Sequence, residues 1–102
     1  MRIIVLFDLP VSTSKLRKEY TKFRKFLIQD GFFMLQFSVY TKIARNHDDA
    51  AKHVARVEKN LPQVGSVRAI VITEKQYTSM YTLVGEKTAE ENFLATNDIL
   101  EL

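Results

Sequence analysis

The sequence predicts an α+β domain in which two helices pack on one face of a four-stranded antiparallel sheet. Two observations carry this prediction. Segments rich in β-branched and apolar residues alternate with two segments of helical periodicity, in the order β-α-β-β-α-β. The chain has 102 residues, enough for one modest core, and its 46% apolar content argues against disorder. Two crossover connections around a central hairpin give this order the arrangement of a ferredoxin-like sandwich.

The first strand and the first helix come from the N-terminal third of the chain. Residues 2–7 predict a strand, because every residue after Arg2 is apolar, three of them are β-branched and no helical period is present; Pro10 then interrupts strand pairing. Hydroxyl side chains at residues 12–14 can cap a helix that runs from Lys15 to just before Gly31. Its inward face has apolar residues at helical spacing. These are Leu16, Tyr20, Phe23 and Leu27.

The middle of the chain predicts strand followed by helix. Residues 32–43 have the aromatic and β-branched content of one long strand, or of two short strands broken by a bulge. Alternation along this segment places four apolar residues on one side. These are Phe33, Leu35, Phe37 and Val39. A second helix is expected from near residues 46–49 to Pro62. Its inward stripe is Ala50, Val54, Val57 and Leu61.

The last elements are a buried strand at residues 66–73, a short helical turn at 74–80 and a short strand at 81–84. We expect the ferredoxin-like domain to span residues 1–85, followed by an acidic C-terminal tail at 86–102. Aromatic side chains on both sides of the 32–40 segment leave the second sheet face apolar, and such a face needs a cover. A second copy of the chain is the expected cover, so we predict a homodimer, and the short last strand could pair across it.

Charge is distributed unevenly along the chain, whose net charge is +3. Residues 86–102 carry five acids against one base, a net charge of −4, so the preceding residues carry +7. A basic body with an acidic tail predicts one polyanionic partner and one partner of a different kind. An ordinary solvated surface is the alternative interpretation.

The first helix carries a second stripe, opposite its apolar face, that is almost entirely basic. Within residues 15–25 only Glu19 opposes six bases, whereas a neutral surface helix intersperses acids with bases. A stripe of one sign binds phosphates irrespective of base sequence, and the binding is salt-sensitive. A solvated outer helix face is the structural alternative. The residues expected to bind a nucleic-acid backbone are Lys15, Arg17, Lys18, Lys22 and Lys25.

Asp8 ends the first strand, just before the turn at Pro10. Its carboxylate could cap that turn or the following helix. The functional alternative is a Mg²⁺ ligand, since this ion prefers hard oxygen ligands and phosphate. A single carboxylate seldom suffices, so the two Asp8 side chains of a homodimer would flank one ion. Such an ion would polarise a phosphoryl oxygen or activate water for phosphodiester attack, which makes Asp8 the candidate catalytic residue.

Composition excludes other kinds of site. The chain has no cysteine, which excludes disulfides and thiolate metal sites. Its apolar runs are too short for a membrane span or a signal peptide, so we predict a cytoplasmic protein without membrane contact. No glycine-rich phosphate loop or zinc-ligand spacing is present. His47 and His53 are expected on the surface, and the aromatic residues of 32–40 in core or interface packing rather than stacked on RNA bases.

Four blocks of sequence resemble one known family. They are Ile4-Val5-Leu6-Phe7-Asp8-Leu9-Pro10, Tyr20-x-x-Phe23-Arg24-Lys25-Phe26-Leu27, Gly31-Phe32-x-x-x-Gln36-Phe37-Ser38-Val39-Tyr40 and Val71-x-Thr73-Glu74-Lys75-Gln76-Tyr77. In this order they resemble the second CRISPR-associated protein family, the small dimeric subunit of the spacer-acquisition complex. The resemblance covers residues 2–85, and it is strongest to members found beside the large single-protein, RNA-guided nuclease.

The resemblance implies a ferredoxin-like homodimer between two dimers of the larger CRISPR integrase subunit, a heterohexamer that holds short double-stranded DNA for insertion into the CRISPR array. The integrase performs the transesterification in such complexes. Some relatives are described as metal-dependent nucleases on RNA or DNA, and Asp8 matches their metal-binding aspartate. The tail resembles the segment with which relatives engage the integrase. Its apolar residues are Phe93, Leu94, Ile99 and Leu100.

Two main hypotheses follow. The leading hypothesis is a non-catalytic, DNA-binding structural subunit of spacer acquisition, which bridges integrase dimers and holds the duplex by its phosphates. The alternative is a Mg²⁺-dependent endonuclease that hydrolyses RNA or DNA phosphodiesters with the paired Asp8 residues. A third hypothesis, a small-molecule-sensing regulatory domain, would need glycine-rich loops, and the chain has only 3 glycines.

Overall fold

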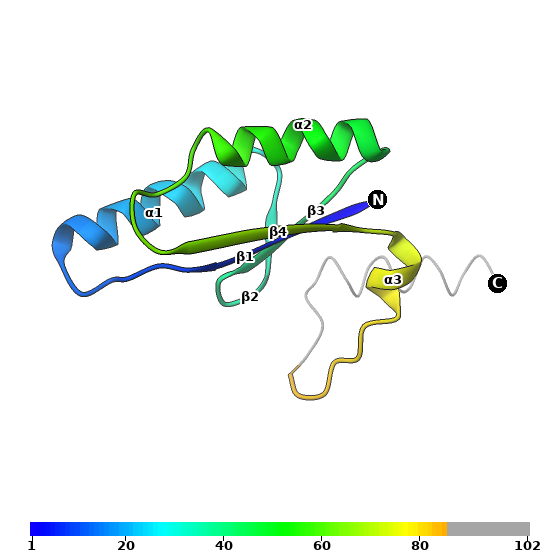
Figure 1. Ribbon diagram of the computed structural model, residues 1–102. Helices are drawn as coiled ribbons and strands as arrows, with labels where there is room; N and C mark the ends of the chain where they lie inside the picture. Colours follow the sequence, from blue (N-terminus) through cyan, green and yellow to red (C-terminus); the bar gives the residue numbers. More distant parts are fainter. Residues whose placement is uncertain (86–102) are drawn as a thin grey trace.

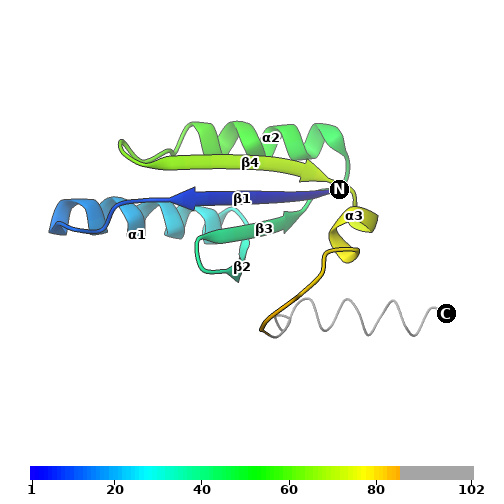
Figure 2. The same cartoon turned by 60° about the horizontal axis from the view of Figure 1, so that its bottom comes forward.

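The computed structural model describes residues 1–85, which form a layer of helices over a four-stranded sheet (Figures 1 and 2). The elements are β1 (Arg2–Asp8), α1 (Ser14–Gln29), β2 (Phe33–Gln36), β3 (Val39–Ile43), α2 (His47–Glu58), β4 (Ser66–Ile72) and α3 (Glu74–Thr78). The predicted tail, with Phe93, Leu94, Ile99 and Leu100, lies outside the described residues. Within residues 1–85, no helix combines the length and apolarity needed to cross a membrane.

The order of the strands confirms the ferredoxin-like α+β fold. The sheet runs β2-β3-β1-β4, and every neighbouring pair is antiparallel. Helix α1 joins β1 to β2, and α2 joins β3 to β4, with another strand lying between the two members of each pair. Figure 2 shows β1 between β3 and β4. On the β3 side the register of β1 ends at Leu6, opposite Val39, so Asp8 extends beyond its last β3 partner.

The two long helices begin where they were predicted to begin, each at a side-chain cap. Thr13 accepts a hydrogen bond from the Leu16 amide at 3.2 Å, which satisfies one of the free amides of the first turn of α1. Asn46 accepts one from the Asp49 amide at 2.8 Å and so starts α2. Helix α1 is followed by Gly31 with a φ of +100°, a conformation that favours glycine.

The core lies between the helices and the inner face of the sheet. Alternation along β1 directs Ile3, Val5 and Phe7 into this layer, where they are 0%, 0% and 7% exposed. The Phe7 ring packs against Phe23 of α1 and Tyr40 of β3, with ring centroids 5.2 and 5.7 Å away. These contacts fix the end of β1 that carries Asp8.

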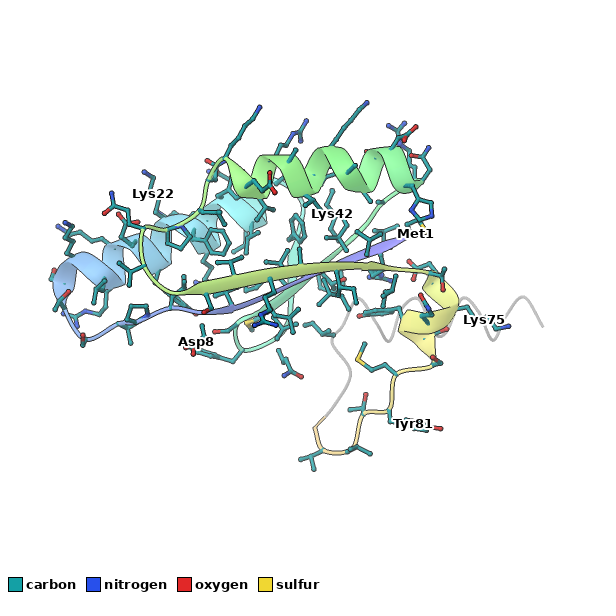
Figure 3. All side chains as sticks on the ribbon, viewed as in Figure 1. Met1, Asp8, Lys22, Lys42, Lys75 and Tyr81 are labelled. Carbon is teal, nitrogen blue, oxygen red and sulfur yellow. The ribbon has the colours of Figure 1, made fainter. Side chains whose placement is uncertain are left out.

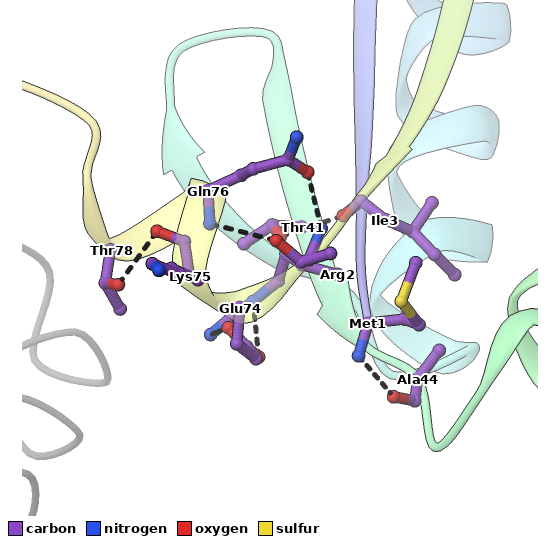
Figure 4. Close-up of polar contacts among 10 residues, drawn as sticks. Met1, Arg2, Ile3, Thr41, Ala44, Glu74, Lys75, Gln76 and Thr78 are labelled. Carbon is purple, nitrogen blue, oxygen red and sulfur yellow. Dashed lines mark hydrogen bonds and ion pairs between the residues drawn. The ribbon is translucent and has the colours of Figure 1, made fainter.

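Helix α3 covers one end of the other sheet face. Arg2 of β1 is only 1% exposed there, because it makes a two-point ion pair with Glu74 at 3.1 and 3.2 Å (Figure 4). The guanidinium carbon of Arg2 also lies 3.9 Å from the centre of the Tyr77 ring. The large apolar side chains left exposed on this face are Leu6, Ile43 and Ile70, at 41%, 49% and 51%. We call it the open face.

Of the two alternatives for residues 32–43, the structure has two short strands, and the predicted row of four apolar residues on one side is interrupted because the segment is a hairpin. Strands β2 and β3 are joined at Phe37 and Ser38, and Ser38 has a φ of 63°. This turn reverses the chain and leaves Phe37 80% exposed. Likewise α2 ends at Glu58, so Leu61 lies beyond the helix and is 48% exposed rather than on its inward stripe.

The predicted strand at 81–84 is absent from the described protomer. Tyr81, Leu83 and Val84 are between 87% and 94% exposed, and the segment leads from α3 away from the sheet (Figure 1). A strand requires a neighbouring backbone to pair with. None lies beside this segment within residues 1–85, so its strand-like composition is not sufficient to form one.

Candidate functional site

Asp8 lies at the end of a buried strand with its carboxylate exposed to solvent. Its neighbour Phe7 points into the core, so the alternation of β1 places Asp8 on the open face. Figure 3 shows Asp8 and Lys22 on opposite sides of the sheet. The predicted carboxylate and the predicted basic stripe therefore belong to different surfaces of the protomer.

The Asp8 carboxylate does not cap α1, since Thr13 performs that role. Within residues 1–85 it has neither a hydrogen-bond partner nor an ion-pair partner. Two acids on the helical side of the sheet are paired, in contrast: Asp30 bonds to His53 and Arg56, and Asp49 accepts a hydrogen bond from the Arg45 amide. Asp8 thus keeps all of its oxygen lone pairs available for an external group.

Gly65 holds the backbone beside Asp8. Ser66 is the β4 partner of Asp8, and Gly65 immediately precedes it with a φ of +109°. A Cβ added at Gly65 would lie 2.7 Å from the Asp8 carbonyl oxygen, closer than atoms pack. No role for Gly65 was predicted from the sequence. Its position just before the strand β4 is the signal that could have indicated a close approach of two backbones.

The donors near Asp8 fit Mg²⁺ only in part. Within residues 1–85 there is no cluster of three His, Cys, Asp or Glu side chains able to hold a metal ion. Mg²⁺, however, keeps several waters and is commonly bound by one or two carboxylates together with substrate phosphates. The exposed, unpaired Asp8 oxygen atoms are suitable for such a site, and a second carboxylate would have to come from outside the protomer.

The basic stripe of α1 forms one wall of a groove. The groove has a volume of about 740 Å³ and lies between α1 and residues 59–62. Among its lining residues are Arg17, Lys18, Lys22, Lys25 and Lys59, and Glu19 is the one acid. Four of the five predicted phosphate-binding residues therefore meet in this groove, whereas Lys15 does not line it. We call it the basic groove.

Two arginines of the helices are engaged outside the groove. Arg24 donates from Nε to the Tyr40 hydroxyl at 2.7 Å, and this hydrogen bond raises the Arg24 pKa above its ordinary value. Arg56 donates to Asp30 at 2.8 Å. Lys59 joins the basic groove because the chain turns just after α2, which periodicity within either helix could not reveal.

A cluster around His53 joins α2 to the end of α1 and was not expected from the sequence. His53 Nδ1 lies 2.8 Å from one Asp30 oxygen, and its Nε2 lies 3.6 Å from Asp49. Burial opposes the ionisation of Asp30, but hydrogen bonds from His53 and Arg56 outweigh it, and the pKa of Asp30 is lowered. The hydrogen bond from the Arg45 amide likewise lowers the pKa of Asp49. The cluster fastens the two helices together.

Comparison with known families gives one match over most of the chain. The family described as "CRISPR associated protein Cas2" matches residues 1–80. This range contains Asp8, the whole basic groove and the open face.

Individual proteins are similar over a comparable range. A protein of Ligilactobacillus salivarius is 46% identical over 100 residues, which cover 98% of this chain and 99% of that protein. A protein of Acidovorax ebreus is 53% identical over 85 residues, which cover 83% of each chain. A third, from Treponema denticola, is 45% identical over 100 residues, or 98% of this chain and 97% of that protein. All three carry the name "CRISPR-associated endoribonuclease Cas2".

Proposed function

The chain belongs to the Cas2 family of CRISPR-associated proteins, and on this basis we propose that it is a metal-dependent endoribonuclease of a CRISPR system. The names of its relatives favour this hypothesis over the non-catalytic subunit that the sequence placed first. The observation that carries the proposal is the Asp8 carboxylate, which is exposed and unpaired at the end of the buried strand β1. RNA in the cytoplasm is the proposed substrate.

A homodimer built through the open face would complete the site. Leu6, Ile43 and Ile70 on this face are 41–51% exposed, and Asp8 lies on the same face at the end of β1. A second copy covering this apolar surface would bring its own Asp8 to the same interface. The exposed segment 81–84 would find in the second copy the strand partner that the described protomer lacks.

The two Asp8 carboxylates of such a dimer would hold Mg²⁺ together with a phosphate of the substrate. When bound, the ion supplies a positive charge that polarises a phosphoryl oxygen or lowers the pKa of an attacking water. The contribution of this chain is positional: the packing of Phe7 and the close contact at Gly65 fix the strand end from which Asp8 projects.

Cleavage of RNA with and without metal tests the nuclease proposal. We expect cleavage in the presence of Mg²⁺, loss of cleavage with EDTA, and loss in Asp8→Asn, which keeps the shape of the side chain. Asp48→Asn, at an exposed carboxylate in the first turn of α2, is the matched control and should cleave as the wild type does. Equal residual cleavage by Asp8→Asn and wild type would assign the activity to a contaminant.

The basic groove favours a second function, the binding of a DNA backbone during spacer acquisition. The groove contains five bases and one acid on the surface opposite Asp8, so it could hold a duplex without competing for the metal site. In this function a homodimer would lie between two integrase dimers and hold the DNA by its phosphates, with the segment 86–102 engaging the integrase.

The salt dependence of duplex binding tests this second function. Lys22→Glu should weaken binding and reduce the slope of log K against log salt by about one for each phosphate that is no longer neutralised. Lys52→Glu changes the same charge on α2, outside the groove, and is the matched control. Identical slopes for the two variants would remove the groove from the binding surface, and normal spacer uptake in a Lys18→Glu/Lys22→Glu variant would contradict the acquisition role.

A further inference from the structure

The basic groove offers apolar contacts as well as positive charge. Phe26 is half-buried in the groove wall, and Leu61 and Pro62 line the opposite side, Leu61 with 48% of its surface exposed. A phosphate backbone would use the cations and leave these apolar groups without a partner. A ligand that matched the whole groove would combine negative charge with apolar side chains.

The C-terminal segment of this chain has that composition. Residues 86–102 carry five acids against one base and include apolar residues near both of their acidic stretches. The described chain ends at Gly85, and a segment of this length can extend about 56 Å at 3.3 Å per residue. The longest dimension of the structure is 50 Å, so the fully extended segment is comparable in length with the molecule itself.

We infer that the basic groove binds the chain's own acidic segment 86–102. The carboxylates pair with Arg17, Lys18, Lys22, Lys25 and Lys59, and the apolar residues of the segment contact Leu61 and Pro62. The tether makes binding effective at modest intrinsic affinity, because a short linker gives an effective concentration in the millimolar range. The contact is salt-sensitive, since exposed charges are screened beyond about 8 Å at physiological ionic strength.

Occupation of the groove has a regulatory consequence that rests on the proposed DNA-binding function. The segment and a duplex use the same cations, so they exclude each other. A protein that captures the segment therefore frees the groove for nucleic acid, and binding of the two partners becomes positively coupled.

A spin label on the segment tests the contact without nucleic acid. The chain has no cysteine, so Thr96→Cys in the full-length protein gives a single labelling site. At low salt we expect the label to broaden the amide NMR signals of α1 residues such as Lys22 and Phe26, and not those of Leu6 or Ile70 on the open face. Broadening should disappear in 1 M NaCl and in Lys22→Glu, and persist in the matched control Lys52→Glu. Absence of broadening, or broadening confined to the open face, would overturn the inference.

Neutralising the segment tests the regulation separately. Glu90→Gln, Glu91→Gln and Asp98→Asn, combined in the full-length chain, should tighten duplex binding roughly three- to tenfold at low salt. A duplex affinity that is the same in this variant as in the wild type would overturn the competition. If no variant binds duplex at all, the DNA-binding proposal fails, whereas the broadening at α1 still decides whether the segment occupies the groove.

Discussion

The two faces of the sheet differ in how completely the protomer covers them, and β1 contributes to both. On the inner face Ile3, Val5 and Phe7 are at most 7% exposed and are enclosed by α1, α2 and neighbouring strands. On the open face exposure rises along the strand, from 9% at Ile4 to 41% at Leu6 and to the exposed Asp8. Neighbouring residues of one strand thus have different environments.

This difference separates residues that fold the protomer from residues available to partners. Burial of apolar area stabilises the inner face within one chain, so substitutions there should change the free energy of unfolding. The open face retains unburied apolar surface and an unpaired carboxylate. Substitutions there should change assembly and activity with little effect on the fold of the protomer.

The largest expected effect is at the inner face. Phe7→Ala removes a ring that packs against Phe23 and Tyr40, and it should lower the free energy of unfolding by about 3–5 kcal/mol. Leu6→Ala, one residue away on the open face, is the matched control and should cost less, because Leu6 is already 41% exposed. Urea denaturation measures both. An equal loss of unfolding free energy at Phe7 and Leu6 would show that the two faces contribute equally to the stability of the protomer.

A smaller effect is expected at the His53 cluster, where charged side chains rather than apolar ones link the two helices. Asp30→Asn weakens the hydrogen bonds that His53 and Arg56 make to this carboxylate, and it should destabilise the protein by about 1–3 kcal/mol at neutral pH. The folded pKa of Asp30 is lowered, so its contribution is present above the unfolded value of 3.8 and is lost as the pH falls through the folded value. The difference in unfolding free energy between wild type and Asp30→Asn should therefore shrink on acidification below about pH 4.

Asp48→Asn provides the control for this pH dependence, since Asp48 is exposed and outside the His53 cluster. Arg45, His53, Arg56 and Asp49 are unchanged in both variants, so their own titration cancels to first order in the comparison. A wild-type minus Asp30→Asn difference that stayed constant between pH 7 and pH 2 would contradict the lowered pKa.

Most of the fold could be predicted because its signals are local. The caps at Thr13 and Asn46, the helical spacing of Phe23 and Leu27, and the β-branched run of β1 each act within a few residues. The hairpin at Phe37 was left open, since a two-residue turn without glycine carries a weak signal, and Ser38 adopts the positive φ instead. The strand expected at 81–84 does not form within the described protomer, because pairing depends on a second backbone.

The candidate site was predictable as a set of residues but not as an arrangement. Asp8 and the basic stripe could be found from strand-end position and charge, yet their separation onto opposite surfaces depends on the alternation of β1 and the packing of α1. Lys59 enters the groove only through the turn after α2. The His53 cluster joins residues 23 positions apart, a distance over which sequence spacing gives no signal.

The smallest effect on the protomer is expected at the centre of the open face. Leu6→Lys should change the unfolding free energy of the isolated chain by no more than about 0.5 kcal/mol, because a surface position tolerates charge. It should nevertheless abolish self-association, since a homodimer would bury two lysines without partners. The wild-type unfolding midpoint should therefore rise with protein concentration, as it does for any associating protein, and the midpoint of the variant should not. Val11→Lys, at a 50% exposed residue beyond the end of β1, should behave as the wild type. If the unfolding midpoint is independent of concentration in all three proteins, the chain does not self-associate through the open face. Asp8 would then have to act without a second Asp8.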